Sequence, residues 1–355
     1  RFSNSGIQTL RDAPSNARTE GFAWLARASY LTREHEITTL GQRVISRLQE
    51  KTVAVFDEID LPVIETEHGE IHFAISTGKA KALQCPVCQY AARKDLARFA
   101  KETPSSEDEL PTEKVFTPDC YTIEALADFL DIPTRKTAKA IMLTRLADRK
   151  LVFAMVRGDM QLSEAKLKKH IGEFEPATYE EISAAGASAG FASPIALKDT
   201  LITVDNLIPQ SHNLVAGANE EGYHLLNLNY GRDYTAEIVA DLVEAPEGAA
   251  CPNCGGSLEL FKTDLVAEKD EEKLKLYPTE LLQALAETHH DKNGLTFPIE
   301  AAPFHIHLLV IPGRKTDTFS VGDDVYEKLQ KAGYPVLYDD RDTRAGIKFN
   351  DADLL

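Results

Sequence analysis

The sequence predicts an α/β (α+β) protein of several domains, in which one module is inserted into a host fold. Two short cysteine pairs, Cys85-Pro-Val-Cys88 and Cys251-Pro-Asn-Cys254, bracket the middle of the chain. Two such C-x-x-C hairpins can close one tetrahedral thiolate site only if the chain between them returns to its starting point. The stretch between them, about residues 116–241, alternates helical and strand patterns, and the chain ends in a β-α-β pattern. These observations predict a self-contained module whose function is separate from that of its host.

Composition limits the class of protein. The 355 residues are enough for two or three hydrophobic cores, and a hydrophobic fraction of 43% is ordinary for a globular protein. No apolar run is long enough to span a membrane and no signal-peptide pattern opens the chain, so we expect a cytoplasmic protein without a membrane partner. The net charge of -17 argues against DNA binding, and any RNA contact needs a local basic patch.

The host segments combine helical and strand patterns. Apolar residues at helical spacing predict helices over 20–31 and 40–48, and shorter apolar runs predict strands over 61–64 and 70–75. The polar, acidic and proline-containing run 101–114 predicts a linker. After the second cysteine pair, residues 257–280 are charged and give no clear pattern. The remaining predictions are a helix over 280–288, strands over 307–311 and 334–338, and a helix over 323–332.

The module shows a regular α/β rhythm. Thr122 is placed to cap a helix over 123–130, and Ser163 to cap the helix that carries Lys166, Lys168 and Lys169. That lysine cluster is more typical of a solvated helix face than of an RNA contact. The apolar run 151–156 is typical of a strand buried on both faces. Further strands are predicted over 141–143, 201–205 and 224–229, with a Gly/Ala/Ser-rich loop over 186–197.

The four paired cysteines give the strongest signal from residue types alone. Their spacing predicts a closed, structural zinc site made by Cys85, Cys88, Cys251 and Cys254. The alternative is two unrelated turns that carry free thiols. The proline and glycine residues around the second pair favour the metal. The fifth cysteine, Cys120, is expected to be a buried apolar side chain.

Several separated blocks of the chain resemble a bacterial prolyl-tRNA synthetase, and agreement over so many blocks is specific. The blocks are TLRDAPSNA and TTLGQRVISRLQE near the start; TPDCYTIEALADFLDIPTRKTAKAIML, LVFAMVRGDMQLSEAKLKK, GFASP, GANEEGYHLLNLNYGRD and VADLVE in the module; and APFHIHLLVIP and YDDRDTRAGIKFNDADLL near the end. The resemblance implies a remnant class II synthetase core with the first zinc knuckle over 1–115 and an inserted aminoacyl-tRNA editing domain over 116–245. It also implies the second zinc knuckle and the return of the core over 246–302, and a partial anticodon-binding domain over 303–355.

The chain also departs from the family pattern. Between Glu65 and Gly69 the family carries a long stretch that includes its second class II motif, and this stretch is missing here. Glu280 stands where the third motif ends in an arginine. Reversing a charge beside a triphosphate is unfavourable by roughly several kcal/mol. These departures predict a degenerate paralogue without an ATP site, which has lost proline activation.

The resemblance assigns the candidate site residues. Lys139 corresponds to the lysine that holds the terminal adenosine of the tRNA and its phosphate, although a lysine in such a position is by itself more often solvated surface. Asp205 and His224 correspond to further pocket positions, and we group them with Lys139 as catalytic. The substrate-binding residues are Gly190, Phe191, Ala192, Ser193 and Pro194 in the G-x-x-x-P loop, and Gly217 and Asn219 at the pocket floor.

The leading interpretation is an editing hydrolase that acts in trans on mischarged tRNA-Pro, with alanyl-tRNA-Pro as the expected substrate. In this interpretation a bound water cleaves the ester and the pocket is too small for proline. The first alternative is a non-catalytic paralogue that binds tRNA or a partner protein. The second alternative, a prolyl-tRNA ligase, is the least favoured by the missing motifs. A homodimer formed through the remnant core is a further expected partner.

Overall fold

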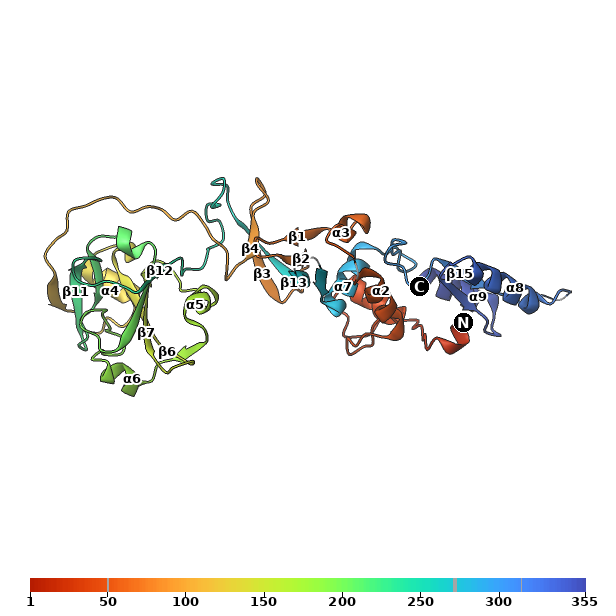
Figure 1. The fold of residues 1–355 in the computed structure, drawn as a ribbon, viewed down its shortest axis with the longest axis horizontal. Helices are drawn as coiled ribbons and strands as arrows, with labels where there is room; N and C mark the ends of the chain where they lie inside the picture. Colours follow the sequence, from red (N-terminus) through yellow and green to blue (C-terminus); the bar gives the residue numbers. More distant parts are fainter. Residues whose placement is uncertain (50, 271–272, 314) are drawn as a thin grey trace. The chain divides into compact units, whose positions relative to one another are not determined.

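The computed structural model describes residues 1–49, 51–270, 273–313 and 315–355 (Figure 1). Its contacts divide the chain into two compact units, residues 1–82 with 261–355 and residues 83–260. The second unit therefore contains both cysteine pairs together with the inserted module. Both units mix helices and strands, which confirms the predicted α/β multidomain class. The four-segment division stays a prediction. Within the described residues, we find no helix with the length and apolar character needed to cross a membrane.

The first unit has a helical core beside a small antiparallel sheet. Thr19 and Thr38 cap its first two α-helices, because their side chains accept hydrogen bonds from the free amides of the first turn. Apolar residues of these helices, such as Phe22 and Val44, form one buried cluster with residues of α7, such as Leu281. The helices of residues 1–82 and 261–302 are η1 (Phe2–Asn4), α1 (Glu20–Arg27), α2 (Thr39–Leu48), α3 (Val55–Glu58) and α7 (Pro278–Thr288).

The sheet of the first unit explains the stretch that gave no clear pattern. Its strand order is β1-β2-β13-β14 with antiparallel neighbours. The strands are β1 (Val63–Glu65), β2 (Glu70–Ala74), β13 (Glu259–Asp270) and β14 (Lys273–Leu276), and β3 (Ala80–Gln84), like β13, crosses the boundary between the two units. Charged residues interrupt the apolar pattern of β13, so periodicity did not reveal it.

The end of the chain forms the predicted β-α-β arrangement and one further helix. Strands β15 (Ile306–Leu309) and β16 (Val336–Asp339) pair in parallel, and α8 (Thr318–Lys331) connects them. The final helix, α9 (Ala345–Leu354), was not predicted. It buries Lys348 completely, and the Nζ atom of this lysine donates to the carbonyl oxygens of Val310 (2.7 Å) and Asp339 (3.0 Å).

The second unit is built on a five-stranded sheet with the order β12-β9-β7-β6-β8, of which β12, β7 and β6 are labelled in Figure 1. The central strand β7 is buried on both faces, as predicted: Phe153 and Met155 enter one apolar cluster, while Val152 and Val156 enter another. A three-stranded sheet has the order β10-β11-β5. The elements are β4 (Ala91–Arg93), β5 (Glu113–Phe116), α4 (Ile123–Leu130), η2 (Thr134–Lys136), β6 (Ala138–Arg145), β7 (Leu151–Arg157), α5 (Glu164–Ile171), β8 (Phe174–Pro176), α6 (Tyr179–Ala184), β9 (Thr200–Asp205), η3 (Ile208–Gln210), β10 (Leu214–Gly217), β11 (Tyr223–Leu228) and β12 (Ile238–Ala240).

Candidate functional site

A cavity of about 590 Å³ lies in the second unit, between the start of α4, strand β6 and the predicted Gly/Ala/Ser-rich loop. Its apolar wall includes the aliphatic side chains of Leu126, Met142 and Ile182 and the small side chain of Ala192. The polar and aromatic groups in its lining include Tyr121, Glu124, Lys139, Gln161 and His224. Polar groups that converge on a cavity with apolar walls are the usual form of a small-ligand site.

Lys139 is the cation of this cavity. Strand β6 holds it opposite Val156 of β7, and its Nζ atom donates to Oε1 of Gln161 over 3.0 Å. A lysine side chain carries three donor hydrogens. Within the described part of the chain Gln161 uses one of them, which leaves donor capacity for an anionic group in the cavity.

His224 enters the cavity wall from β11 as a neutral ring. Its Nδ1 lies 2.6 Å from Oγ1 of the buried Thr117, and its ring meets that of Phe191 edge to face at 5.4 Å. Burial lowers the pKa of His224 to about 4. The imidazole is therefore uncharged at neutral pH. It can form hydrogen bonds without adding positive charge to the site.

The G-x-x-x-P loop, residues 190–194, is held against β10 by two residues that the sequence had assigned to the pocket floor. An added Cβ at Gly217 would lie 2.1 Å from the carbonyl carbon and oxygen of Phe191, so only glycine permits this approach. Asn219 makes three hydrogen bonds to the loop. Its backbone amide donates to Phe191 (2.8 Å), its Oδ1 accepts from the Ser193 amide (2.7 Å), and its Nδ2 donates to the Ile195 carbonyl (2.9 Å).

Replacing Asn219 with alanine is expected to loosen this loop. The change leaves the Ser193 amide and the Ile195 carbonyl without these partners, which costs roughly 1–3 kcal/mol. Local opening should therefore become roughly 5- to 150-fold more frequent. Hydrogen–deuterium exchange of peptides covering residues 190–197 measures this. Asn293→Ala, in a turn of the first unit, is the control and should leave that exchange unchanged. Equal exchange in both variants would show that Asn219 does not hold the loop in place.

Asp205 does not line the cavity, so its position does not support the catalytic role assigned from the sequence. Its Oδ1 accepts from the Leu207 amide (3.0 Å), and its Oδ2 accepts from the Leu242 amide (2.9 Å) and from Nζ of Lys101 (2.7 Å). Oδ2 thus joins the end of β9 to the two segments through which the chain enters and leaves the module, while Oδ1 holds the turn that follows β9.

Lys166 belongs to the same structural network rather than to a solvated face. It is 5% exposed, and its Nζ donates to the carbonyls of Ala97 (2.7 Å) and Val243 (2.6 Å) and to Oδ2 of Asp241 (2.8 Å). Burial lowers the pKa of Lys166, against the effect of Asp241. Lys168, in contrast, is a surface residue that pairs with Glu173 at 2.9 Å.

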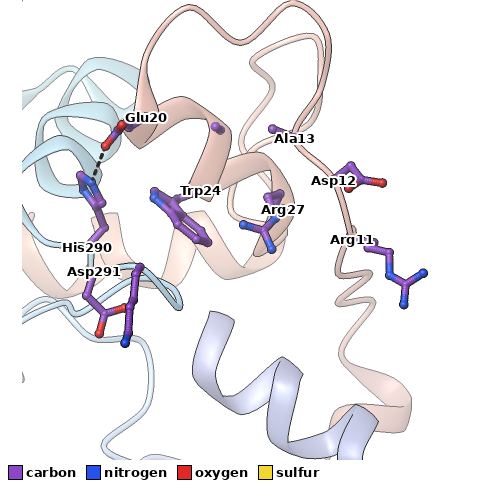
Figure 2. A pocket seen from close by; sticks show the side chains of 10 residues that line it. Arg11, Asp12, Ala13, Glu20, Trp24, Arg27, His290 and Asp291 are labelled. Carbon is purple, nitrogen blue, oxygen red and sulfur yellow. Dashed lines mark hydrogen bonds and ion pairs between the residues drawn. The ribbon is translucent and has the colours of Figure 1, made fainter.

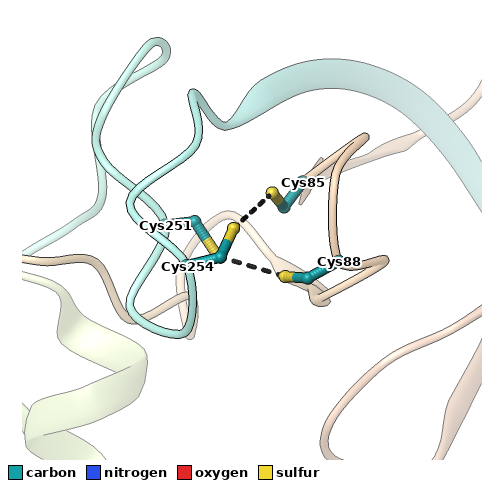
Figure 3. A group of neighbouring side chains, drawn as sticks. All are labelled: Cys85, Cys88, Cys251 and Cys254. Atoms are coloured by element: carbon teal, nitrogen blue, oxygen red, sulfur yellow. Dashed lines mark hydrogen bonds between the residues drawn. The ribbon is translucent and has the colours of Figure 1, made fainter.

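The four paired cysteines come together, as the spacing predicts (Figure 3). All four Sγ atoms lie within 4.8 Å of one another, with two separations of 3.5 Å, Cys85–Cys254 and Cys88–Cys251. Four sulfurs placed about 2.3 Å from a central zinc ion are roughly 3.8 Å apart, so the donor set and its spacing fit this ion. The Cys88 amide lowers the pKa of the Cys85 thiol to about 7, whereas burial and the neighbouring thiols raise the pKa values of Cys88 and Cys254.

A second large cavity, about 660 Å³, lies in the first unit (Figure 2). The guanidinium group of Arg27 stacks on the Trp24 ring at 4.4 Å, and Nε2 of His290 lies 3.0 Å from a carboxylate oxygen of Glu20. Further charged residues of both signs line it, namely Arg11, Asp12, Asp291 and Lys292. Because these charges offset one another, this cavity does not select one class of ligand as clearly as the cavity beside Lys139.

Sequence reasoning missed Gln161, Tyr121 and Thr117. Each is an ordinary residue type whose role depends on contacts with distant segments. Of the residues that the resemblance assigned to the site, Lys139, Gly190, Ala192, Gly217 and His224 line this one cavity. Phe191 contacts two of the lining residues, Tyr121 and His224, and Asn219 forms hydrogen bonds with Phe191 and Ser193.

Comparisons with known proteins match two segments to families and most of the chain to curated relatives. Residues 117–233 match the aminoacyl-tRNA editing domain, and residues 307–355 match the anticodon binding domain. A protein of Thermoanaerobacter sp. (strain X514) named "Proline--tRNA ligase" is 37% identical over 87% of this chain and 61% of its own length. A protein of the same name from Salinispora tropica is 37% identical over 81% of this chain and 54% of its own length.

The chain thus spans somewhat more than half of the length of these curated relatives. A solved structure described as a putative trans-editing enzyme for prolyl tRNA synthetase covers 38% of the chain, with 18% identity and a TM-score of 0.32, a likeness too weak to bear on function. The relatives that match most of the chain are named as ligases. This finding contradicts the leading sequence interpretation of a stand-alone deacylase, and the expected loss of aminoacylation is not supported.

Proposed function

Because this chain belongs to the prolyl-tRNA synthetase family and carries an editing domain and an anticodon-binding domain, we propose that it is a proline–tRNA ligase in which the cavity beside Lys139 hydrolyses wrongly charged tRNA. Editing would then serve the ligase of the same protein. One observation carries the proposal. Every residue that lines the cavity falls between 120 and 224, inside the segment that matches the editing domain.

The cavity supports hydrolysis by water rather than by a side-chain nucleophile. The one thiol in its lining, Cys120, is buried, and burial raises its pKa. A thiol in this state is a poor nucleophile. In the proposed step, a water oxygen bonds to the ester carbonyl carbon and the bond to the ribose oxygen breaks. The ribose oxygen leaves with a proton that comes from the water.

Each polar group has a place in this step. Lys139 would hold a phosphate of the terminal nucleotide through a charge-assisted hydrogen bond and so position the ester. The backbone of Gly190 and Ala192, in the cavity wall, would orient the aminoacyl group. His224, neutral at pH 7, would exchange hydrogen bonds with the substrate or the water. The aliphatic side chains of the wall, such as Leu126, Met142 and Ile182, limit the size of the amino acid, and rejection by size is how we expect proline to be spared.

The ligase part of the proposal has to be consistent with Glu280, because its negative charge led to the sequence-based prediction that proline activation is lost. In the structure Glu280 lies in the first turn of α7, and Nζ of Lys79 lies 3.3 Å from its Oε1. The carboxylate is therefore paired, and its repulsion of an anionic ligand is partly offset. Lys79 is separated from Glu280 by two hundred residues of sequence, so the sequence pattern did not predict this pair.

We expect the protein to hydrolyse alanyl-tRNA-Pro at least tenfold faster than the uncatalysed rate, to spare prolyl-tRNA-Pro, and to support proline-dependent exchange of pyrophosphate into ATP. The measurements are release of the amino acid from each charged tRNA and the exchange assay against a control without enzyme. Cys120→Ser should retain hydrolysis, because the thiol is not the nucleophile. Hydrolysis without exchange would remove the ligase half of the proposal, and exchange without hydrolysis would remove the editing half.

The cysteine cluster supports a structural proposal. We propose that Cys85, Cys88, Cys251 and Cys254 bind one zinc ion, which joins the segments on either side of the inserted module. The support is a donor set of four thiols with a spacing suited to a tetrahedral ion. Gly255 has a φ of +77°, in the left-handed region that a tight turn between Cys254 and the following strand uses. A closed site of this kind leaves no position for catalysis.

A further inference from the structure

The segment predicted to be a linker is fixed to the surface of the second unit. Residues 102–113, here called the acidic strap, contain five acidic residues and no lysine or arginine. Asn213 holds the strap from both sides: its Oδ1 accepts from the Leu110 amide (2.9 Å), and its Nδ2 donates to the Asp108 carbonyl (2.9 Å). Arg232 donates to the Leu110 carbonyl (2.8 Å), and its Nη1 lies 3.5 Å from a carboxylate oxygen of Glu109. The strap therefore follows a defined path.

Beneath its first half lies a groove of about 310 Å³ whose other wall is basic. The strap contributes Glu102 and Glu107, and the body of the unit contributes four basic side chains. These are Arg135, Lys136, Arg157 and His212. We call the space between these four side chains and the strap the basic groove. Lys136 donates to a carboxylate oxygen of Glu107 and holds the pKa of that carboxyl below its usual range. A surface that fixes a carboxylate in this way favours anions at that position.

The basic groove keeps positive charge that its own ion pairs do not neutralise. Arg157 is paired with Asp159 at 2.7 Å, and Lys136 is shared between Glu107 and the His212 carbonyl, which lies 3.3 Å from its Nζ. Arg135 is exposed, and among the described residues no carboxylate lies within ion-pair distance of it. If a phosphate displaced the Glu107 carboxylate, two adjacent cations, Arg135 and Lys136, would therefore be able to bind that phosphate.

The basic groove and the cavity share structural elements. Arg135 and Lys136 form the turn η2, which leads directly into β6 and Lys139. Arg157 pairs with Ala138 across the β6–β7 ladder, and the next residue, Gly158, lines the cavity. Lys139 follows Lys136 by three positions, which is about 10 Å of extended chain. The nucleotides that precede the one held at Lys139 can cover this distance.

We propose that the basic groove binds the phosphate backbone of the tRNA acceptor end, and that Glu107 of the acidic strap competes with those phosphates for Lys136. The proposal rests on the proposed function, because it takes the tRNA end to lie in the cavity beside Lys139. It resolves the mismatch between a net charge of -17 and an RNA partner, since a local patch of cations supplies the electrostatic contact.

The test measures the binding of an uncharged tRNA-Pro transcript to the full chain. Fluorescence anisotropy gives the affinity at several salt concentrations. Because the RNA carries no amino acid, binding is measured independently of hydrolysis. Each lost phosphate contact lowers the magnitude of the slope of log K against log salt by about 0.7 for a single strand. Because both cations face one phosphate, the double variant Arg135→Gln/Lys136→Gln should lower this magnitude by about 0.7 and weaken binding about tenfold or more. Glu107→Gln should strengthen binding roughly threefold or more at low salt.

Lys168→Gln is the matched control, because Lys168 is also a surface lysine of this unit paired with a glutamate. It should change the affinity less than about twofold. If the groove variants and Glu107→Gln change affinity and slope no more than this control, the groove proposal fails, whether or not the protein hydrolyses charged tRNA. If the variants shift binding as expected but no charged tRNA is hydrolysed, the proposed editing function fails and the groove remains. An unrelated hairpin RNA of equal length that shows the same affinity and the same response to the variants would overturn the assignment to the acceptor end.

Discussion

Replacement of Lys139 with methionine is expected to slow hydrolysis of the aminoacyl ester by about ten- to hundredfold while leaving the fold intact. A lysine that holds a phosphate in a partly dehydrated cavity makes a charge-assisted contact of roughly 1.5–3 kcal/mol. Each 1.36 kcal/mol of lost transition-state stabilisation corresponds to about a factor of ten in rate. Methionine retains the apolar stem, so packing against β7 is conserved. Single-turnover release of alanine from alanyl-tRNA-Pro measures the effect.

Stability separates a lost contact from a damaged fold. Lys139 is half-buried and makes one side-chain hydrogen bond, to Gln161, so its replacement should change the free energy of unfolding by less than about 1 kcal/mol. Lys168→Met is the control for the loss of one positive charge from the same unit. Unchanged hydrolysis in the Lys139 variant would show that the cavity does not use this lysine. An equal loss in both variants would indicate a general electrostatic effect.

The parts of the fold that the sequence predicted are those set by local patterns. The run 151–156 is continuous and apolar, and it becomes a strand buried on both faces. Thr122 and Ser163 cap the helices that they precede, since capping depends on a side chain and an amide three residues away. The β-α-β pattern at the end of the chain was also local. Helix α9 was not, because its buried positions include Lys348 and Asp351, which no hydrophobic pattern marks.

The candidate site was predicted in part for the same reason. The resemblance located Lys139 and the loop at residues 190–194, because these lie in blocks of matching sequence. Asp205, which the resemblance also assigned to the pocket, does not line the cavity, and a carboxylate at the end of a strand carries no sign of whether it faces a cavity or a buried lysine. Lys166 was interpreted as solvated because lysine usually is, but three oxygen acceptors from distant segments surround its ammonium group. Such pairings depend on the tertiary structure and have no local signature.

Removal of the metal from the cysteine cluster is the second change with a large expected effect. Protein purified without chelator should contain about one equivalent of zinc, as a closed four-ligand site requires. Cys85 and Cys251 are buried. Without the ion, nothing bonds their sulfur atoms together, and the turns that carry them are no longer connected through the metal. Structural zinc contributes directly to folding free energy. We therefore expect the double variant Cys85→Ser/Cys251→Ser to lose the zinc and to unfold locally, with faster hydrogen exchange over residues 83–100 and 246–260.

The fifth cysteine provides the control for this experiment. Cys120 lies outside the cluster, next to the cavity, so Cys120→Ser should keep one equivalent of zinc and normal exchange over both segments. Reaction of the native protein with a thiol reagent gives an independent measure, because four metal-bound thiolates react slowly until a chelator releases the ion. Protein that contains no zinc, and in which the exposed Cys88 and Cys254 react at once without chelator, would show that the two pairs are free thiols brought together by the fold alone.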